Sequence, residues 1–256
     1  MNFLNNLPQV TKNLLLLNIT VFIVVLILAQ QGTDYTGLLG AHYINSPLFE
    51  PFQMITYMFM HSLNDFLHIV FNMLLLVMFG AHLERIWGPK RFFLFYFACG
   101  IGAFALYNAI GVWEIMELKS QVTSLGYDVS TMDNILINNF PLDATSALEQ
   151  EMASKGGADV VNKYFRMIQT PMVGASGALF GILAGFAVLF PNTQLMLLFP
   201  PIPIKAKYLI GAYLVFEVYN SFYANDQIAH LAHVGGAIVG IILVLYWRKT
   251  DRSNFY

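Results

Sequence analysis

Apolar runs alternate with more polar segments along this chain. The runs are close to the roughly 20 residues that a helix needs to cross the hydrocarbon core of a bilayer. Charged residues, Gly or Pro bound them, as is common for membrane helices. The pattern predicts one all-α, polytopic membrane domain over 1–256, with six helices at about 13–30, 66–84, 91–112, 174–190, 205–223 and 228–247.

Two stretches do not fit this pattern, and we expect them to lie largely outside the hydrocarbon. They are 31–65 and the much more polar 113–170, which is far longer than a simple connection between helices. Apolar residues recur at helical intervals in the second stretch, at Val160, Val161, Tyr164, Phe165 and Ile168. This long extracytoplasmic loop has two interpretations: a docking surface for a substrate or partner, or an insertion without a part in the chemistry.

The composition supports a membrane protein. Apolar residues make up 57% of the chain and charged residues only 11%, against roughly 25% charged in soluble domains. The net charge of −2 and the lack of a basic block argue against nucleic-acid binding. The single cysteine, Cys99, cannot form an internal disulfide and is expected to be a core residue. The pattern implies no metal and no other cofactor.

The positive charges predict the orientation, because Lys and Arg collect in cytoplasmic loops. With the N-terminus inside, nine of the thirteen basic residues fall in cytoplasmic segments: Lys12, Arg85, Lys90, Arg91, Lys205, Lys207, Arg248, Lys249 and Arg252. The other four lie in the 113–170 loop, on the opposite side. Both termini are therefore predicted to be cytoplasmic.

In this topology the second, fourth and sixth helices are parallel, so residues near their starts share one depth. Those starts hold His68 and Asn72, Ser176, and His233. Polar side chains inside a membrane helix are costly and usually face the protein interior or a water-filled cavity. One such Ser or His more often packs or bonds across helices, but four at one depth favour a functional site.

Small residues predict which of these helices touch. Glycines recur at steps of four in the fourth and sixth helices, at Gly177, Gly181, Gly185, Gly236 and Gly240. Small residues at this spacing allow two helix backbones to approach closely. We therefore expect the two helices to pack together and to bring Ser176 within reach of His233.

These residue types suit acyl transfer. A serine hydroxyl becomes an effective nucleophile when a neighbouring base takes its proton, and an imidazole suits that role near neutral pH. Ser176 is the predicted nucleophile, and His233 the general base and acid. His68 and Asn72, one turn apart on one helical face, are the predicted oxyanion donors, with the backbone N–H of Ser176. No obvious carboxylate completes a triad, so we predict a dyad.

Three further polar residues have weaker signals. His61, just before the second helix, is open between a local loop contact and a role at the site. His230, within one turn of His233, is expected to support it. Glu217, near the end of the fifth helix, is expected to lie near the outer boundary or to be hydrogen-bonded to the bundle.

At these positions the chain resembles the rhomboid family of intramembrane serine proteases. The segment GASG at 174–177 resembles the family's serine motif, and AH at 232–233 with the glycines that follow resembles its histidine helix. HIVFN at 68–72 is similar to the HxxxN element of the second helix, and His61 to a further histidine upstream. GAHLER at 80–85 is similar to the close of that helix.

The resemblance implies a six-helix core whose dyad lies in a water-filled cavity open to the outer face. It also implies substrates that are transmembrane proteins in the lipid bilayer, cut within or beside a membrane segment after a small residue. The fifth helix and the following loop, about Tyr219 to Gln227, would gate their entry. A compact six-helix chain is more typical of bacterial relatives and so implies the bacterial inner (plasma) membrane. The oligomeric state is not implied.

The chain departs from the family pattern in its first loop and next to its serine. Phe52-Gln53 stands where relatives often have Trp-Arg, which puts the anchoring role of that pair in doubt. Phe180, four residues after the serine, stands where relatives often have Tyr. It keeps ring stacking on His233 possible without the hydroxyl. Gly174, two residues before the serine, is a candidate supporting residue.

Two other function classes compete with a protease. A non-catalytic relative that binds and escorts membrane clients would be favoured by the loss of the serine or the histidine, and both are present. A small-solute transporter could also use intramembrane His and Asn. Transporters commonly carry internal repeats with matched broken helices, and the two halves of this sequence show no convincing repeat.

Overall fold

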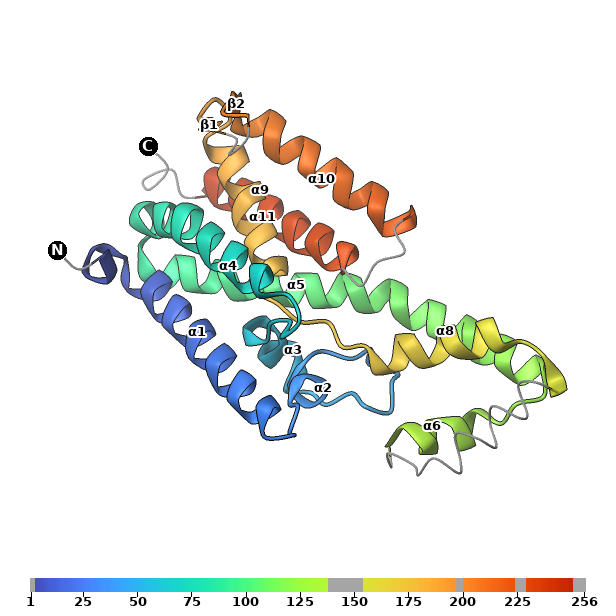
Figure 1. Ribbon diagram of the computed structural model, residues 1–256. Helices are drawn as coiled ribbons and strands as arrows, with labels where there is room; N and C mark the ends of the chain where they lie inside the picture. The colour runs from blue at the N-terminus through green and yellow to red at the C-terminus, as the bar shows by residue number, and fades with distance from the viewer. Residues whose placement is uncertain (1–2, 138–153, 197–199, 224–228, 251–256) are drawn as a thin grey trace.

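The structure, a computed structural model, describes residues 3–137, 154–196, 200–223 and 229–250. Helices dominate it (Figure 1). The longer ones are α1 (Gln9–Gln30), α4 (Phe66–Leu75), α5 (Ala81–Ser124), α6 (Val129–Ile137), α8 (Ala158–Gln169), α9 (Ser176–Leu189), α10 (Ala206–Tyr223) and α11 (His230–Thr250). The short segments are η1 (Phe3–Asn6), α2 (Thr36–Leu39), α3 (Gln53–Thr56), η2 (Tyr57–Phe59), η3 (Leu76–Gly80), β1 (Gln194–Met196) and β2 (Pro203–Lys205).

Each of the six predicted spans overlaps a helix of the structure. By length and composition, three helical stretches of the described chain are able to cross a membrane: Gln9–Gln30, Phe66–Ser124 and His230–Thr250. Helix α9 is apolar but shorter. The protein is thus a helical membrane protein, and the count of six crossings stays a prediction.

The second and third predicted spans form one helical run that folds back on itself. The run starts at α4, passes through the π-helical turn η3 and enters α5. Gly88 interrupts α5 with φ +75° and ψ 167°, a conformation that only glycine adopts without strain. Pro89 follows, and a proline suits the first turn of a new helix because it has no N–H to leave unpaired. The chain reverses direction here (Figure 1).

The third helix is longer than predicted. The sequence placed its end near residue 112, where polar residues become frequent, but α5 continues to Ser124. Ile115, Leu118 and Val122 are buried at helical spacing along this extension. The span of about 91–112 follows the apolar run and stays a prediction, whereas the helix continues past it because an amphipathic helix needs only one apolar stripe.

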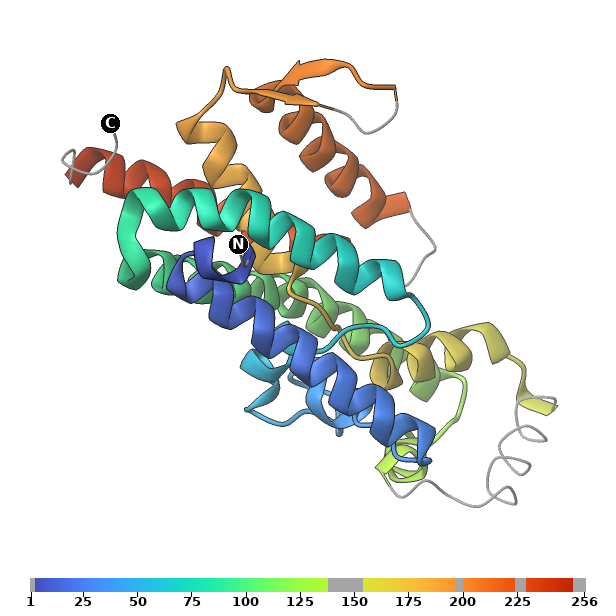
Figure 2. The ribbon, with the colours of Figure 1, turned by 60° about the vertical axis from the view of Figure 1, so that its left-hand side comes forward.

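This extension forms a small lobe with α6 and α8, here named the α8 lobe and comprising 113–137 and 158–169. It projects from one end of the bundle in both ribbon views (Figures 1 and 2). Its buried side chains form a cluster apart from the main core, together with Tyr43 of the first loop: Ile115, Leu118, Val122, Tyr127, Met132, Val161, Tyr164 and Ile168. The helical interval predicted in α8 is therefore confirmed, with three of its five apolar residues fully buried.

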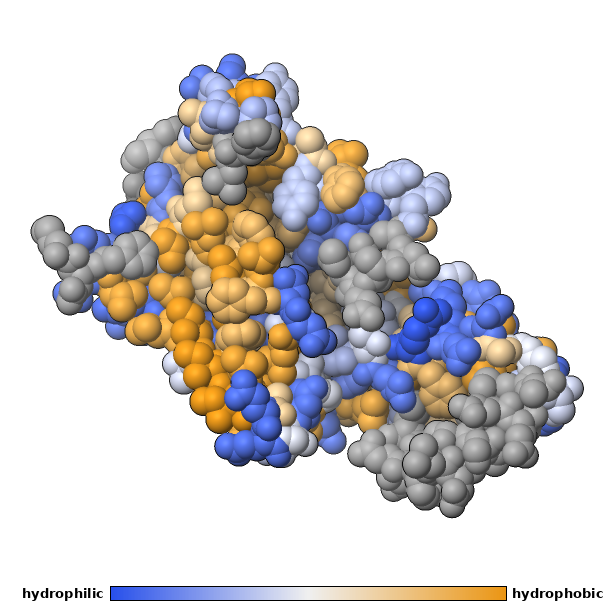
Figure 3. Space-filling view, viewed as in Figure 1, coloured by the Kyte–Doolittle hydropathy of each residue, from blue (hydrophilic) through white to orange (hydrophobic). Residues whose placement is uncertain are grey.

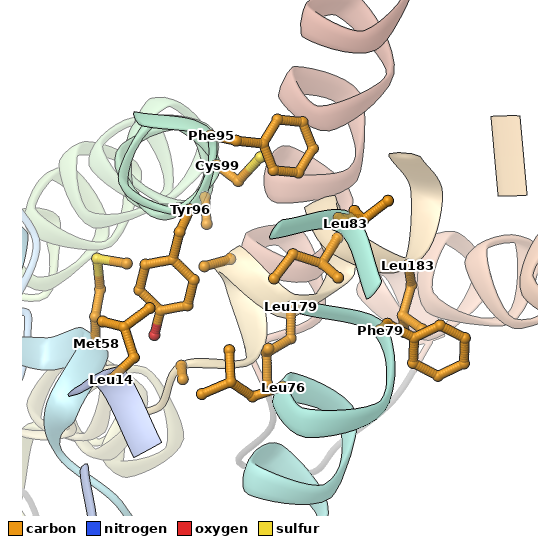
Figure 4. Close-up of a cluster of buried hydrophobic side chains, with 14 of the residues drawn as sticks. Leu14, Met58, Leu76, Phe79, Leu83, Phe95, Tyr96, Cys99, Leu179 and Leu183 are labelled. Carbon is orange, nitrogen blue, oxygen red and sulfur yellow. The ribbon is translucent and has the colours of Figure 1, made fainter. Parts of the chain in front are cut away.

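The main core lies between α1, α4, α5 and α9. Its side chains meet around Leu76, Tyr96 and Leu179, and Cys99 is buried beside them, as predicted (Figure 4). The Tyr57 hydroxyl donates to the Gly100 carbonyl at 2.7 Å, so the first loop is tied to α5 inside this core.

Helices α9 and α11 pack through glycine, as predicted. A Cβ atom on Gly240 would lie 2.5 Å from the Gly181 carbonyl oxygen and 2.8 Å from its Cα. A Cβ on Gly181 would lie 2.9 Å from the Gly236 oxygen. The two backbones are therefore in direct contact, which fixes the distance between the N-terminal ends of the helices.

A buried carboxylate ties α1 to the end of the second predicted span. Glu84, only 3% exposed, accepts hydrogen bonds from the backbone N–H groups of Val10 and Thr11 at 2.8 and 2.7 Å. The Thr11 hydroxyl donates to it as well, at 2.7 Å. N–H groups in the first turn of a helix have no partner within the helix, and a negative charge there is favourable.

Gln53 anchors the first loop, although Phe52-Gln53 stands where relatives often have Trp-Arg. Its side chain is fully buried. The amide nitrogen donates to the carbonyls of Leu38 and Leu48, both at 3.1 Å, and the amide oxygen accepts from the His42 N–H at 3.2 Å. The pair Phe52-Gln53 thus holds the loop through Gln53, while Phe52 is exposed.

The surface divides into an apolar and a polar part. Orange, hydrophobic residues cover the face formed by the helical bundle, and hydrophilic residues gather over the α8 lobe (Figure 3). Many exposed side chains of the bundle are large and apolar, among them Ile23, Phe66 and Val215. This division fits a bundle in lipid and a lobe in water.

Candidate active site

Ser176 is the first residue of α9, and the segment before it is held in place by the first loop. Met172 and Ala41 exchange backbone hydrogen bonds of 2.8 Å, and the Gly174 N–H donates to the Tyr57 carbonyl at 3.0 Å. Ala175 at the N-cap makes no side-chain hydrogen bond to the helix. The N–H groups of the first turn thus stay free of a side-chain cap, and such groups attract negative charge.

His233 lies one turn into α11 and faces Ser176. Its Nε2 is 2.8 Å from the serine Oγ, a normal distance for a hydroxyl that donates to an imidazole nitrogen. The His233 side chain is 90% buried, whereas Ser176 is half-buried. The contact follows from the glycine packing of α9 and α11, which brings the first turns of the two helices together.

Phe180 stacks on the imidazole of His233. The ring centroids are 4.2 Å apart, and the planes are 11° from parallel. Phe180 is one turn after Ser176 on α9 and is almost fully buried. The predicted stacking is therefore present, and it restricts rotation of the His233 ring.

A carboxylate does stand beside His233, contrary to the prediction of a site without one. Glu217 comes from α10, and its Oε2 is 2.7 Å from the Nδ1 of His233. The same oxygen is 2.7 Å from the Nδ1 of His230. Glu217 is only 3% exposed, so of the two positions expected for it, the one bonded to the bundle is correct. His230 contacts this group as the supporting residue that the sequence predicted.

The sequence does carry a signal for Glu217. An ionisable residue within an apolar helix is expensive unless it has partners, and it is therefore a functional candidate. Glu217 is the one acidic residue between Ala206 and Tyr223. Its two partners lie 13 and 16 residues later on another helix, and no spacing rule relates residues on separate helices.

The His68 ring and the Ser176 hydroxyl both lie next to Gly174. A Cβ atom on Gly174 would lie 2.8 Å from the His68 Nε2 and 3.5 Å from the Ser176 Oγ. Gly174 has φ +121°, so both its conformation and the lack of a side chain are used here. The Ser62 N–H points to His68 Nδ1 at 3.5 Å, and this contact favours the tautomer with the proton on Nε2.

Asn72 is buried one turn after His68. Its amide nitrogen donates to the His68 carbonyl at 2.8 Å, within α4 itself. The amide therefore has to rotate away from that carbonyl before it can donate to another oxygen. His68 and Asn72 share one face of α4, as predicted, and their contact with a reacting oxygen stays a prediction.

His61 is buried beside His68. The two rings meet edge to face with centroids 5.2 Å apart, and His61 is 1% exposed. Neither of its ring nitrogens has a hydrogen bond of good geometry to the described residues. Burial, followed by the nearby His68, lowers the pKa of His61 to about 3, so the ring is neutral. His61 thus lies next to the site, in contact with His68.

One hollow of the described structure lies away from the predicted chemistry. A hollow of about 290 Å³ lies in the α8 lobe, between Trp113 on α5 and Lys163 on α8, and none of the predicted site residues lines it.

The predicted gate starts at Tyr219, which is exposed at the end of α10. Most of its following loop, 224–228, lies outside the described residues.

Comparison with known proteins identifies a family that matches most of the bundle. The chain matches the family described as Rhomboid domain over residues 48–115 and 150–250, together more than half of its length. Both blocks contain site residues: His61, His68 and Asn72 in the first, and Ser176, Glu217 and His233 in the second. Residues 116–149, between the blocks, belong in large part to the α8 lobe.

Two curated proteins are similar to parts of the chain. Rhomboid protein 1, mitochondrial, from Saccharomyces cerevisiae is 33% identical over 79 residues, which are 31% of this chain and 23% of that protein. RHOMBOID-like protein 12, mitochondrial, from Arabidopsis thaliana is 28% identical over 204 residues, 79% of this chain and 47% of that protein. The chain therefore spans less than half the length of either relative.

Proposed function

We propose that this chain, which belongs to the rhomboid family, is an intramembrane serine endopeptidase. Its nucleophile is Ser176. One observation carries the proposal. The Ser176 Oγ and the His233 Nε2 are 2.8 Å apart at the N-terminal ends of two helices packed backbone to backbone.

The chemistry follows from this contact. His233 takes the hydroxyl proton of Ser176 as the oxygen attacks the carbonyl carbon of a peptide bond, and it then gives that proton to the leaving amine. Water repeats the sequence to release the acyl group. The stacked ring of Phe180 keeps His233 at the angle that both proton transfers need.

The attack leaves a negative oxygen that needs donors already in place. The backbone N–H of Ser176, at the start of α9, provides one, and the dipole of the helix favours the charge. His68 lies beside Gly174 with its Nε2 toward the site, and Asn72 is one turn away. We assign both as oxyanion donors, with Asn72 rotating when the substrate binds.

The family and the apolar surface of the bundle support transmembrane proteins as substrates. A substrate helix has to unwind before its backbone reaches Ser176, and unpaired N–H and C=O groups are costly in lipid. Polar groups gathered at one end of α9 and α11 lower that cost. We expect cleavage within or just beside a membrane segment, after a small residue.

The location and orientation in the membrane are part of the proposal. The distribution of Lys and Arg supports cytoplasmic termini and an α8 lobe on the opposite side. The bacterial inner membrane is the predicted location, whereas both relatives are named as mitochondrial proteins. Tagging either end and testing its accessibility in sealed vesicles decides the orientation.

The main test is cleavage of a single-span substrate by the purified protein in liposomes. Ser176→Ala and His233→Ala are expected to lower kcat/KM by about 10⁴-fold or more, because serine and histidine act as one unit. Ser124→Ala, in which only an exposed hydroxyl bonded to the Gln121 carbonyl is lost, is the matched control and should cut like wild type. A fluorophosphonate should label the wild type at Ser176.

Two results would contradict the proposal. One is cleavage that survives in Ser176→Ala, which would place the nucleophile elsewhere. The other is a wild-type protein that cuts none of several single-span substrates and takes up no fluorophosphonate, although it binds these substrates. The second result would favour the client-binding class.

A further inference from the structure

Glu217 is a carboxylate buried in an apolar part of the protein. It is a single acidic residue on the apolar helix α10, and it is almost completely buried. Removing a carboxylate from water is expensive unless hydrogen bonds and charges replace the lost hydration. Here one oxygen, Oε2, meets two imidazole nitrogens, the Nδ1 atoms of His230 and His233, both at 2.7 Å.

The arrangement determines where the proton on each ring lies. An ionised carboxylate oxygen only accepts hydrogen bonds, so both Nδ1 atoms must carry a proton. In a neutral imidazole the other nitrogen is then bare. His233 Nε2 is therefore the acceptor that faces the Ser176 hydroxyl, which is the tautomer that a general base needs.

We propose that Glu217 is a positioning residue that turns the Ser176–His233 pair into a carboxylate–histidine–serine relay. This inference rests on the proposed protease function and extends it. During the attack the serine proton moves to His233 Nε2 while the bond from Oγ to the carbonyl carbon forms. Glu217 keeps its charge, accepts from Nδ1–H throughout, and stabilises the imidazolium until its Nε2 proton passes to the leaving amine.

His230 fixes the carboxylate. It lies three residues before His233, on the same side of α11, and its Nδ1–H donates to the same Oε2. With two donors converging on one oxygen, the carboxylate cannot turn that oxygen away from His233 without losing both bonds. His233 is thus held at three points: Glu217 at Nδ1, Ser176 at Nε2 and Phe180 on the ring face.

A metal ion is the alternative use of these three side chains. Their ligand atoms lie within 4.8 Å of one another. Ligands about 2.1 Å from a tetrahedral ion are themselves about 3.4 Å apart, whereas the two oxygen-to-nitrogen distances here are both 2.7 Å. The spacing is that of hydrogen bonds, so we assign the cluster to proton positioning.

The test compares Glu217→Gln, Glu217→Asp and His230→Gln with wild type in liposomes. Glu117→Gln serves as the matched control, because Glu117 lies on the exposed face of α5 in the α8 lobe. Glutamine keeps the size of the side chain, but its NH₂ group can donate to Nδ1 and so favour the wrong tautomer. We expect kcat to fall by about 10²- to 10⁴-fold with KM within about threefold, as for the equivalent change in other serine proteases.

The conservative variants give the second arm. Aspartate keeps the charge with a shorter reach, so Glu217→Asp should recover at least about tenfold in kcat over Glu217→Gln. The Nε2 amide of glutamine can still donate to Glu217, so His230→Gln should lose less than about tenfold. Addition of EDTA should leave the wild-type rate unchanged. A wild-type rate that EDTA abolishes and zinc restores would overturn the assignment in favour of a metal site.

Nitrogen-15 NMR of His233 gives a readout that does not depend on cleavage. We expect the wild-type ring to carry its proton on Nδ1, and the Glu217→Gln ring to lose that preference. The inference fails if Glu217→Gln keeps kcat within threefold of wild type, or if the wild-type ring carries its proton on Nε2. If Ser176→Ala is inactive but Glu217→Gln is active, the relay is contradicted and the protease function is not. If Ser176→Ala is active, the proposed protease function itself is contradicted.

Discussion

The contact between α9 and α11 in the bundle and the core of the α8 lobe are packed in different ways, although α5 borders both. In the bundle, α9 and α11 meet with no side chain between their glycines. In the lobe, large side chains such as Ile115, Tyr164 and Ile168 fill the space between helices. The lobe surface also carries ion pairs, such as Lys163 with Glu114 at 2.6 Å.

The difference teaches which solvent each region is built for. Lipid tails are as apolar as leucine, so membrane helices gain little by burying large side chains and associate through close backbone packing. In water the burial of apolar area is the main favourable term. Along α5 the buried side chains belong to the bundle core up to Phe104 and to the lobe core from Ile115 on, so the change lies close to the predicted end of the third span.

The largest effect is expected from a single methyl group in the bundle. In Gly236→Ala the new Cβ would lie 2.7 Å from the Gly177 carbonyl carbon, which is backbone and has little freedom to move. We expect destabilisation at or above the upper end of the usual overpacking cost of about 1–3 kcal/mol, with loss of cleavage. Thermal unfolding in detergent measures the first and the substrate assay the second.

Gly211→Ala on α10 is the matched control for this change. A Cβ at Gly211 meets nothing within 4 Å, so the substitution should be neutral or slightly stabilising, because alanine favours a helix over glycine. If both variants unfold at the wild-type temperature, α9 and α11 do not pack through their backbones as described.

A smaller effect is expected in the core of the lobe. Ile168 is fully buried in α8, and Ile168→Val should cost about 1 kcal/mol, since it removes one methylene from a packed site. Its backbone carbonyl, which accepts from the His42 ring at 2.9 Å, is retained. The rate of cleavage should stay within about twofold of wild type, because this core is separate from the site.

A loss of cleavage in Ile168→Val out of proportion to its stability would break the comparison. It would mean that the lobe takes part in the reaction, as in the interpretation of 113–170 as a docking surface. Measuring kcat and KM separately distinguishes the two cases. If the lobe docks substrate, a substitution that weakens docking raises KM and leaves kcat unchanged.

The smallest effect is expected at the exposed start of α6. Hydrogen bonds from the Thr131 and Ser130 hydroxyls, together with their backbone N–H groups, lower the pKa of Asp128. Below the ordinary value of about 3.9 the unfolded chain binds the proton more readily than the folded one, so the stabilisation is present above that pH and is lost on acidification. The protection factors of the α6 amides, which are the intrinsic exchange rates divided by the observed rates at the same pH, should therefore fall in acid.

Asp128→Asn should remove this dependence on pH, because asparagine can cap the helix but cannot titrate. The protection factors of the bundle helices are the internal control and should not change. If the α6 protection factors of Asp128→Asn still fall below pH 4, other groups govern the lobe in acid.

The amino-acid sequence by itself determined the helices, the fact that α9 packs on α11, and the two residues at the centre of the site. Apolar runs report crossing helices because length and hydropathy are local properties. Glycines at steps of four predict close packing, because a helical face without side chains lets another backbone approach it. Ser176 and His233 follow from their places on these two helices, and Phe180 from its distance of one turn.

Only the tertiary structure decided what stands beside His233. Glu217 lies on a third helix, and its contact depends on how α10 rotates and packs, which no period along the chain encodes. The same holds for Gln53, whose partners come from three separate segments of the first loop, and for the extension of α5, which is helical because α6 and α8 cover its apolar stripe. Local patterns specify which face of an element is buried, but the choice of partner is a property of the packed chain.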